Sequence, residues 1–235
     1  MPDLLVRFFG GCNLRKYLLA AIIALAAVVP ASSSTFSYVS WTSLTTTDGI
    51  PTVLGTLPGG ITVAYTGETD FAQLNGIGTN YYEPYDTVYT NVIVSNMPPN
   101  SDMIAIDGSD TVHTVTFSAP ITGLIMDLVS LGQNRPGYET SYTFDQAFSI
   151  LSMGPAHWGG PGILQPFNVN TTVTGIEGDG VIQFAGPVST LSWTGASPEY
   201  WNGFTFATPT PIPEPATWGL MLAGLALAGL RRVRR

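Results

Sequence analysis

Hydrophobic and polar residues alternate over short distances through most of the chain. Between residues 32 and 208, runs rich in Val, Ile, Thr, Phe and Tyr are separated by Gly, Pro, Asn and Asp. The runs recur about every 8–15 residues, a spacing typical of strands and turns in antiparallel β domains. No part of this region has the period of an amphipathic helix. We therefore expect residues 32–208 to form a mainly β domain, an antiparallel β-sandwich with jelly-roll-like topology.

Two runs indicate which side chains point into such a sandwich. In HTVTF, His113, Val115 and Phe117 share one face, because successive side chains of a strand point to opposite sides. In LIMDL, the first, third and fifth residues share one face, and Asp127 lies opposite them. We expect His113 to be a half-buried strand residue rather than a catalytic group.

Two ten-residue segments, 117–126 (FSAPITGLIM) and 184–193 (FAGPVSTLSW), resemble each other. Each has Phe, then Pro three residues later, then a β-branched residue and a large apolar end. We interpret each as a strand, a proline corner and the next strand, because proline has no N–H to give to a sheet. They would suit a sandwich built from two related halves. The alternative is ordinary chance similarity in a β-rich sequence.

A first long apolar run lies near the N-terminus. Arg15 and Lys16 precede thirteen mostly apolar residues, 17–29, and Ala31 follows shortly after. A helix of thirteen residues spans about 20 Å, which is less than the ~30 Å hydrocarbon core of a membrane. The arrangement predicts a secretory signal peptide at 1–31, cleaved after Ala31.

A second apolar run lies at the other end of the chain. Alternating prolines make residues 209–215 a stiff linker, since proline fixes φ and interrupts helices. Residues 216–230 carry no charge and predict one short membrane helix. Residues 231–235 are rich in arginine, which stays on the cytoplasmic side of a membrane. The body at 32–208 is therefore expected outside the cytoplasm.

The C-terminal tail thus contains a Pro-Glu-Pro motif, an apolar segment and an arginine cluster, in that order. The residues of the motif and the cluster are Pro213, Glu214, Pro215, Arg231, Arg232, Arg234 and Arg235. This arrangement resembles a PEP-CTERM sorting signal. The resemblance implies a Gram-negative bacterium that makes extracellular polysaccharide. It also implies an exosortase, a membrane cysteine protease that recognises the motif.

The same resemblance implies where the protein goes. The precursor would be anchored in the inner membrane with its body in the periplasm. The processed form would be at the cell surface or outside the cell, often in a biofilm matrix, where exopolysaccharide is a candidate partner. The named residues would be recognised by the protease and would have no catalytic role.

The body is strongly acidic. Residues 32–208 contain fourteen acidic residues and one basic residue, Arg135, so their formal charge is −13. Such a surface repels phosphate backbones, which argues against nucleic acid as a partner. The single cysteine, Cys12, lies in the predicted signal peptide and permits no disulfide within the chain.

The sequence offers little for catalysis. It has no nucleophile elbow, no zinc-protease motif and no phosphate-binding loop. His157 lies beside Trp158 in the loop GPAHWGGPG, where we expect a surface residue that could touch a ligand. Paired carboxylates could hydrolyse glycosides, but a sequence does not show which carboxylates are paired in space. We expect no catalytic residue, no metal-binding residue and no cofactor.

Two kinds of binding chemistry are open. Acidic turns at 68–70, 107–110 and 177–179 supply oxygen ligands of the kind that calcium prefers, or they are ordinary solvated turns. Two aromatic stretches supply rings that could stack on sugars, or they are core residues. Their rings are Tyr81, Tyr82, Tyr85, Tyr89, Tyr200, Trp201 and Phe204.

The sequence as a whole predicts a non-enzymatic, exported protein of the cell surface or of an extracellular matrix. A carbohydrate- or calcium-binding adhesive module is the alternative, and a secreted hydrolase ranks third.

Overall fold

The computed structural model describes residues 33–107, 111–135, 137–196 and 199–210. The predicted signal helix in 1–31, the predicted membrane helix at 216–230 and the arginine cluster at 231–235 lie outside the described residues. Within the described part of the chain, no helix is long and apolar enough to cross a membrane.

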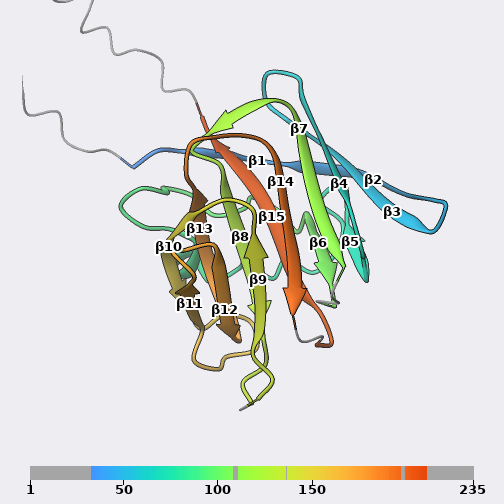
Figure 1. The fold of residues 1–235 in the computed structure, drawn as a ribbon. Helices are drawn as coiled ribbons and strands as arrows, with labels where there is room; N and C mark the ends of the chain where they lie inside the picture. The colour runs from blue at the N-terminus through green and yellow to red at the C-terminus, as the bar shows by residue number, and fades with distance from the viewer. Residues whose placement is uncertain (1–32, 108–110, 136, 197–198, 211–235) are drawn as a thin grey trace, which may run out of the picture. The chain divides into compact units, whose positions relative to one another are not determined.

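The chain forms two sheets (Figure 1). The seven-stranded sheet has the order β10-β13-β8-β15-β6-β5, and β1 also pairs with β15. Its strands are β1 (Phe36–Tyr38), β5 (Phe71–Gln73), β6 (Met103–Ile106), β8 (Ile125–Leu131), β10 (Phe148–Gly154), β13 (Gly178–Phe184) and β15 (Asn202–Pro209).

The eight-stranded sheet has the order β11-β12-β9-β14-β7-β4-β3-β2. Its strands are β2 (Ser40–Thr47), β3 (Ile50–Leu57), β4 (Ile61–Thr66), β7 (Val112–Thr122), β9 (Thr140–Phe144), β11 (Ile163–Phe167), β12 (Thr172–Ile176) and β14 (Pro187–Ala196). The pairings between these strands are antiparallel in both sheets. The prediction of a mainly β fold with two antiparallel sheets is confirmed.

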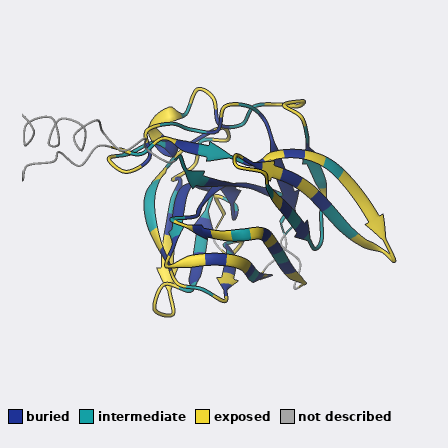
Figure 2. Ribbon diagram, turned by 90° about the horizontal axis from the view of Figure 1, so that it is seen from above, coloured by how far each residue is buried: buried dark blue, intermediate teal, exposed yellow. Residues whose placement is uncertain are grey.

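Apolar side chains from both sheets fill the space between them. On β7, His113, Val115 and Phe117 are all buried, as their alternation predicted. Buried and exposed residues alternate along β7 and β14, whereas β8 is buried at every position. Figure 2 shows buried segments toward the middle of the body and exposed ones in many of its outer loops. His113 is fully buried rather than half-buried, because Tyr65 and Trp193 both stack on its ring.

The seven-stranded sheet is covered on its outer face as well. The segment 74–102 includes the short helix α2 (Asp86–Tyr89). Tyr82 and Tyr89 from this segment pack against residues of the sheet to form a second core. Asp127 lies opposite its apolar neighbours, as predicted, but it is buried too. Desolvation raises the pKa of its carboxyl group well above the ordinary value, because burial disfavours the charged form.

The two similar segments each join a strand of one sheet to a strand of the other. Segment 117–126 leads from β7 to β8, and segment 184–193 leads from β13 to β14. Each segment is a strand, a turn and the next strand, as predicted, and Pro187 directly follows its turn, but Pro120 lies before its turn, contrary to the prediction. Pro120 lies within β7 and Pro187 is the first residue of β14. Pro120 is tolerated because the β7–β14 register shifts between Thr116 and Ile121, so its missing N–H leaves no gap in the ladder.

Both ends of the described body lie side by side. Phe36 of β1 pairs with Pro209 at the end of β15. The backbone N–H of Thr210 donates to the carbonyl of Thr35 at 2.8 Å. The last strand therefore extends to the first residue of the segment predicted as a linker. The start of β15 is the opposite end of this strand, about 25 Å from the paired ends of the described body at 3.3 Å per residue.

Candidate functional site

A group of ring side chains lies together near the start of β15. We call it the aromatic ledge, and its members are Phe71, Tyr81, Tyr85, His157, Trp158 and Trp201. They come from β5, from the segment 74–102, from the loop between β10 and β11, and from the loop before β15. β5 runs directly into the segment 74–102, but the other two segments lie far along the chain from it and from each other, so the fold itself assembles the ledge.

Trp158 is at the centre of the ledge. Its ring stacks on Tyr81 with centroids 5.2 Å apart and an interplanar angle of 26°. It meets Trp201 at 4.9 Å and His157 at 4.7 Å, both edge to face. Trp158 is nevertheless 45% exposed. The stacking partners thus fix the plane of the indole without covering it.

A tight turn presents the two outermost residues. The N–H of Gly159 donates to the carbonyl of Ala156 at 2.9 Å, and the two residues form an isolated β-bridge. His157 and Trp158 occupy the two central positions of this turn. Gly159 has φ of +74°, which suits glycine and allows the chain to reverse directly after Trp158.

The inner members tie the ledge to the sandwich. Phe71, Tyr81, Tyr85 and Trp201 are partly buried and pack against the second core. Phe71 is opposite Ala105 in the sheet, and so is Gly203, two residues after Trp201. Phe71 and Trp201 therefore meet edge to face, with ring centroids 5.1 Å apart. Neighbouring strands set this geometry, which makes the inner half of the ledge rigid.

Carboxyl groups with raised pKa values lie at the same end of the sandwich. Burial raises the pKa of Glu199 and that of Asp179 to about 7 each. The carboxylate of Glu199 accepts hydrogen bonds from the N–H of Gly132 and from the side chain of Asn202, both at 2.8 Å. Asp179 accepts from the N–H of Ser130 at 2.9 Å. Both side chains thus hold loops and neighbouring strands in place.

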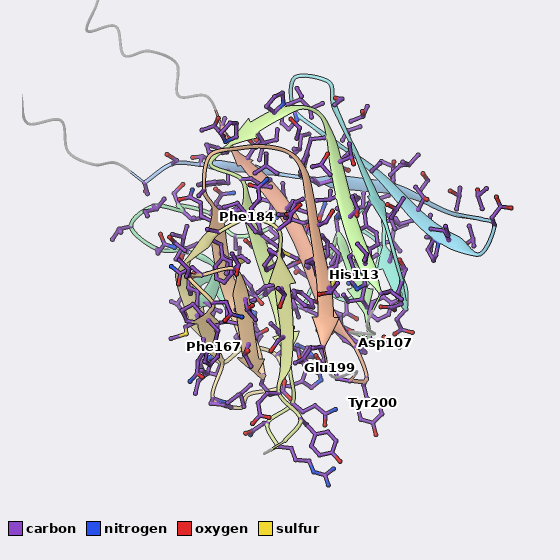
Figure 3. All side chains as sticks on the ribbon, viewed as in Figure 1. Asp107, His113, Phe167, Phe184, Glu199 and Tyr200 are labelled. Carbon is purple, nitrogen blue, oxygen red and sulfur yellow. The ribbon has the colours of Figure 1, made fainter. Side chains whose placement is uncertain are left out.

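Figure 3 places Glu199 and Asp107 near each other at this end, with Tyr200 projecting away from the body. The N–H of Glu199 donates to the carbonyl of Asp107 at 2.7 Å. The N–H of Asp107 in turn donates to both carboxylate oxygens of Glu68 at 3.2 Å. Burial raises the pKa of Glu68 to about 7. Three loops are therefore joined through backbone groups and one carboxylate.

The two predicted aromatic stretches divide into three groups in the structure. Tyr81, Tyr85 and Trp201 belong to the ledge, where the ring contact of Tyr81 with Trp201 joins the stretches at 5.1 Å. Tyr82, Tyr89 and Phe204 are fully buried core residues. Tyr200 is 90% exposed and makes none of the ring contacts that hold the ledge together.

Sequence reasoning placed His157 and Trp158 in an exposed loop but did not connect them with the tyrosines. It missed Phe71 altogether. The dense aromatic content of both stretches was the available signal, but the contacts join residues that are far apart in the sequence. A pattern of local alternation holds no information on which distant loops meet.

The acidic turns proposed for calcium are partly internal supports. Glu177 accepts hydrogen bonds from the Ser130 hydroxyl at 2.8 Å and from the N–H of Asn134 at 3.4 Å. Asp179 is buried next to the same serine. Over the ranges that the structure describes, no three His, Cys, Asp or Glu side chains are grouped so as to hold a metal ion. Calcium binding stays a prediction.

Comparison with known proteins identifies the tail. Residues 211–235 match the PEP-CTERM protein-sorting motif, which confirms the resemblance drawn from the Pro-Glu-Pro segment and the arginine cluster. The chain is accordingly a mainly β body joined to a C-terminal sorting motif. A motif of this kind indicates an exported protein that is anchored in the membrane, recognised by an exosortase and then processed. No curated protein and no solved structure matches the chain.

Proposed function

We propose that this protein is a non-enzymatic structural or adhesive component of the bacterial cell surface or extracellular matrix. The observation that carries the proposal is the sorting motif at 211–235. In this proposal, the signal peptide exports the chain, the apolar tail holds it in the inner membrane, and an exosortase reads the Pro-Glu-Pro segment. The acidic β body is then released or attached outside the cell.

The arrangement of the body's two ends supports this route. β1 and the end of β15 are paired, so the segments before residue 33 and after residue 210 leave the sandwich from one place. A body joined to the membrane through that place has its other end directed away from the point of attachment. Within the part of the chain that the structure describes, the residues of both cores lie between Phe36 and Ala207, away from the two terminal segments.

The buried carboxyl groups support a non-catalytic role. A general acid or base needs a shifted pKa and access to substrate. Asp179 has a shifted pKa but is buried, and its oxygen accepts a backbone N–H. Glu199 and Glu68 likewise accept backbone N–H groups. Their shifted pKa values follow from structural burial. A secreted hydrolase therefore remains the third of the three functional hypotheses.

The sorting step is tested by the intact mass of the protein recovered from its native host. We expect the mature form to have lost residues at both ends. In a Glu214→Ala variant, we expect the C-terminal loss to stop, because the recognition motif is broken. An Ile212→Ala variant is the matched control, since it alters the same linker outside the motif and should be processed normally.

Two results would contradict the proposal. One is a mature wild-type protein that still contains Arg235. The other is equal processing of the wild type and the Glu214→Ala variant, which would make the tail an ordinary membrane anchor.

A further inference from the structure

We propose that the aromatic ledge binds a neutral polysaccharide chain, with a sugar ring stacked on Trp158. This inference rests on the proposed function for its biological setting, since a matrix protein meets polysaccharide. The binding itself depends only on the geometry of the body.

Packing alone does not explain the ledge. An aromatic side chain stabilises a fold by leaving water, and Trp193 of the inner core is 1% exposed. Trp158 is 45% exposed and lies in a turn rich in glycine and proline, where it supports no strand. Its partner in the turn, His157, is exposed as well. The outer half of the ledge thus keeps apolar ring surface in water.

The exposed rings are held in fixed positions. Tyr81 stacks on Trp158, and the rings of Trp158 and Trp201 meet edge to face at an interplanar angle of 81°. His157 also meets Tyr81 at 90° and 5.0 Å, so the turn is fixed by two contacts. A ring that is already immobilised loses little conformational entropy when a flat ligand stacks on it. The C–H face of a pyranose is such a ligand.

The charges around the ledge select the type of sugar. Exposed carboxylates directly adjoin ledge residues in the sequence, with Asp70 before Phe71 and Asp86 after Tyr85. Glu177 packs close to Gly160, two residues after Trp158. The only cation in the body's sequence is Arg135, which lies over the ring of Tyr138 at 4.3 Å. Carboxylates accept hydrogen bonds from sugar hydroxyls and repel uronic acids or sulfated sugars.

The position of the ledge fits an external ligand. It lies at the start of β15, whereas the two ends of the described body are paired at the other end of that strand. A body tethered through its chain ends therefore presents the ledge on the side away from the tether. A polymer outside the membrane can reach it there without passing the attachment point.

The test is affinity electrophoresis of the purified protein in gels that contain one polysaccharide each. The neutral panel consists of β-1,4-glucan, β-1,3-glucan, α-glucan, mannan and galactan, and the acidic panel of alginate and polygalacturonate. We expect retardation by at least one neutral polymer and by neither acidic one. In a Trp158→Ala variant, we expect the affinity for the retarding polymer to fall about tenfold or more, the effect of losing one aromatic contact.

Tyr200→Ala is the matched control, because Tyr200 is an exposed aromatic residue next to Trp201 that lies outside the ledge contacts. It should bind like the wild type. Melting temperatures establish that both variants are folded, and light scattering measures their oligomeric state. Three outcomes would overturn the inference: no retardation by the neutral panel, equal losses in the two variants, or a change of oligomeric state in Trp158→Ala, which would make the ledge a protein interface. None of them depends on whether the tail is processed.

Discussion

The molecule has two aromatic clusters of similar composition but opposite surroundings. In the inner cluster, Trp193 meets Tyr65, Phe204 and Phe206 between the two sheets, with centroids 5.3–6.2 Å apart. All four side chains are at most 1% exposed. In the aromatic ledge, Trp158 makes equally close ring contacts but keeps nearly half of its surface in water.

The comparison shows that ring contacts alone do not reveal what a cluster is for. The inner rings point from strands whose alternation forces them inward, so their burial stabilises the fold. The outer rings of the ledge are on a turn that no sheet requires. Stability should therefore depend on the first cluster and binding on the second.

The largest expected effect comes from truncation of the inner cluster. We expect Trp193→Ala to lower the free energy of unfolding by about 3–5 kcal/mol, because it leaves a cavity between the sheets. Trp158→Ala should lower it by about 0.5 kcal/mol or less, as for a surface residue. Denaturation by urea measures both values, and equal losses would remove the distinction between the clusters.

A smaller but broad effect is expected from pH. The carboxyl groups of Asp179, Glu199 and Glu68 have their pKa raised from ordinary values near 4 to about 7. Between these pH values, these three groups hold more protons in the folded protein than in the unfolded chain, so their contribution to stability is largest near pH 4 and is lost as the pH rises to 7. The melting temperature should decrease accordingly by several degrees. The inner aromatic cluster has no carboxyl group to contribute to this trend.

Asp179→Asn isolates part of that pH effect. The amide oxygen can still accept the Ser130 N–H, while the group no longer titrates. We expect a flatter dependence of the melting temperature on pH between 4 and 7 in this variant. An unchanged slope would show that Asp179 does not carry a raised pKa.

In the second core beneath the ledge, we expect a loss of unfolding free energy between those of Trp193→Ala and Trp158→Ala. The hydroxyl of Tyr89 contacts the carbonyl of Leu128 and the carboxyl of Asp179, each at 3.3 Å. Tyr89→Phe should cost about 1 kcal/mol of unfolding free energy, since it leaves both partners without this donor. Tyr85→Phe changes a partly buried tyrosine of the same segment and should leave the unfolding free energy unchanged. Chemical denaturation of the two variants at one pH provides the comparison.

How far the sequence predicts the structure differs between the same two regions. Alternation along HTVTF correctly placed His113, Val115 and Phe117 inward, because the period of a strand is a local property. The same local rule put Asp127 on the opposite face but gave no sign that the segment 74–102 would cover that face. It also placed the prolines at corners, whereas Pro120 is accommodated by a register shift that only the pairing of β7 with β14 creates.

The ledge was the least predictable feature. Its rings were visible as aromatic stretches, but Tyr82 and Tyr81 are neighbours with opposite fates, one fully buried and the other in the ledge. The contact of Tyr81 with Trp201 joins loops that are far apart in the chain. Such proximity follows from strand order in the sheets, which the sequence pattern does not specify. The tail, in contrast, was identified from residues alone, because a linear motif is defined by residues that follow one another in the sequence.

The most direct test of the central distinction measures stability and polysaccharide binding on the same samples of three variants: Trp158→Ala, Tyr200→Ala and Trp193→Phe. We expect Trp158→Ala to lose retardation by the neutral polymer while it keeps the wild-type melting temperature. Tyr200→Ala should keep both properties, and Trp193→Phe should lose stability while it still binds. A Trp158→Ala protein that melts early and binds normally would contradict the assignment of packing to the inner cluster and binding to the ledge.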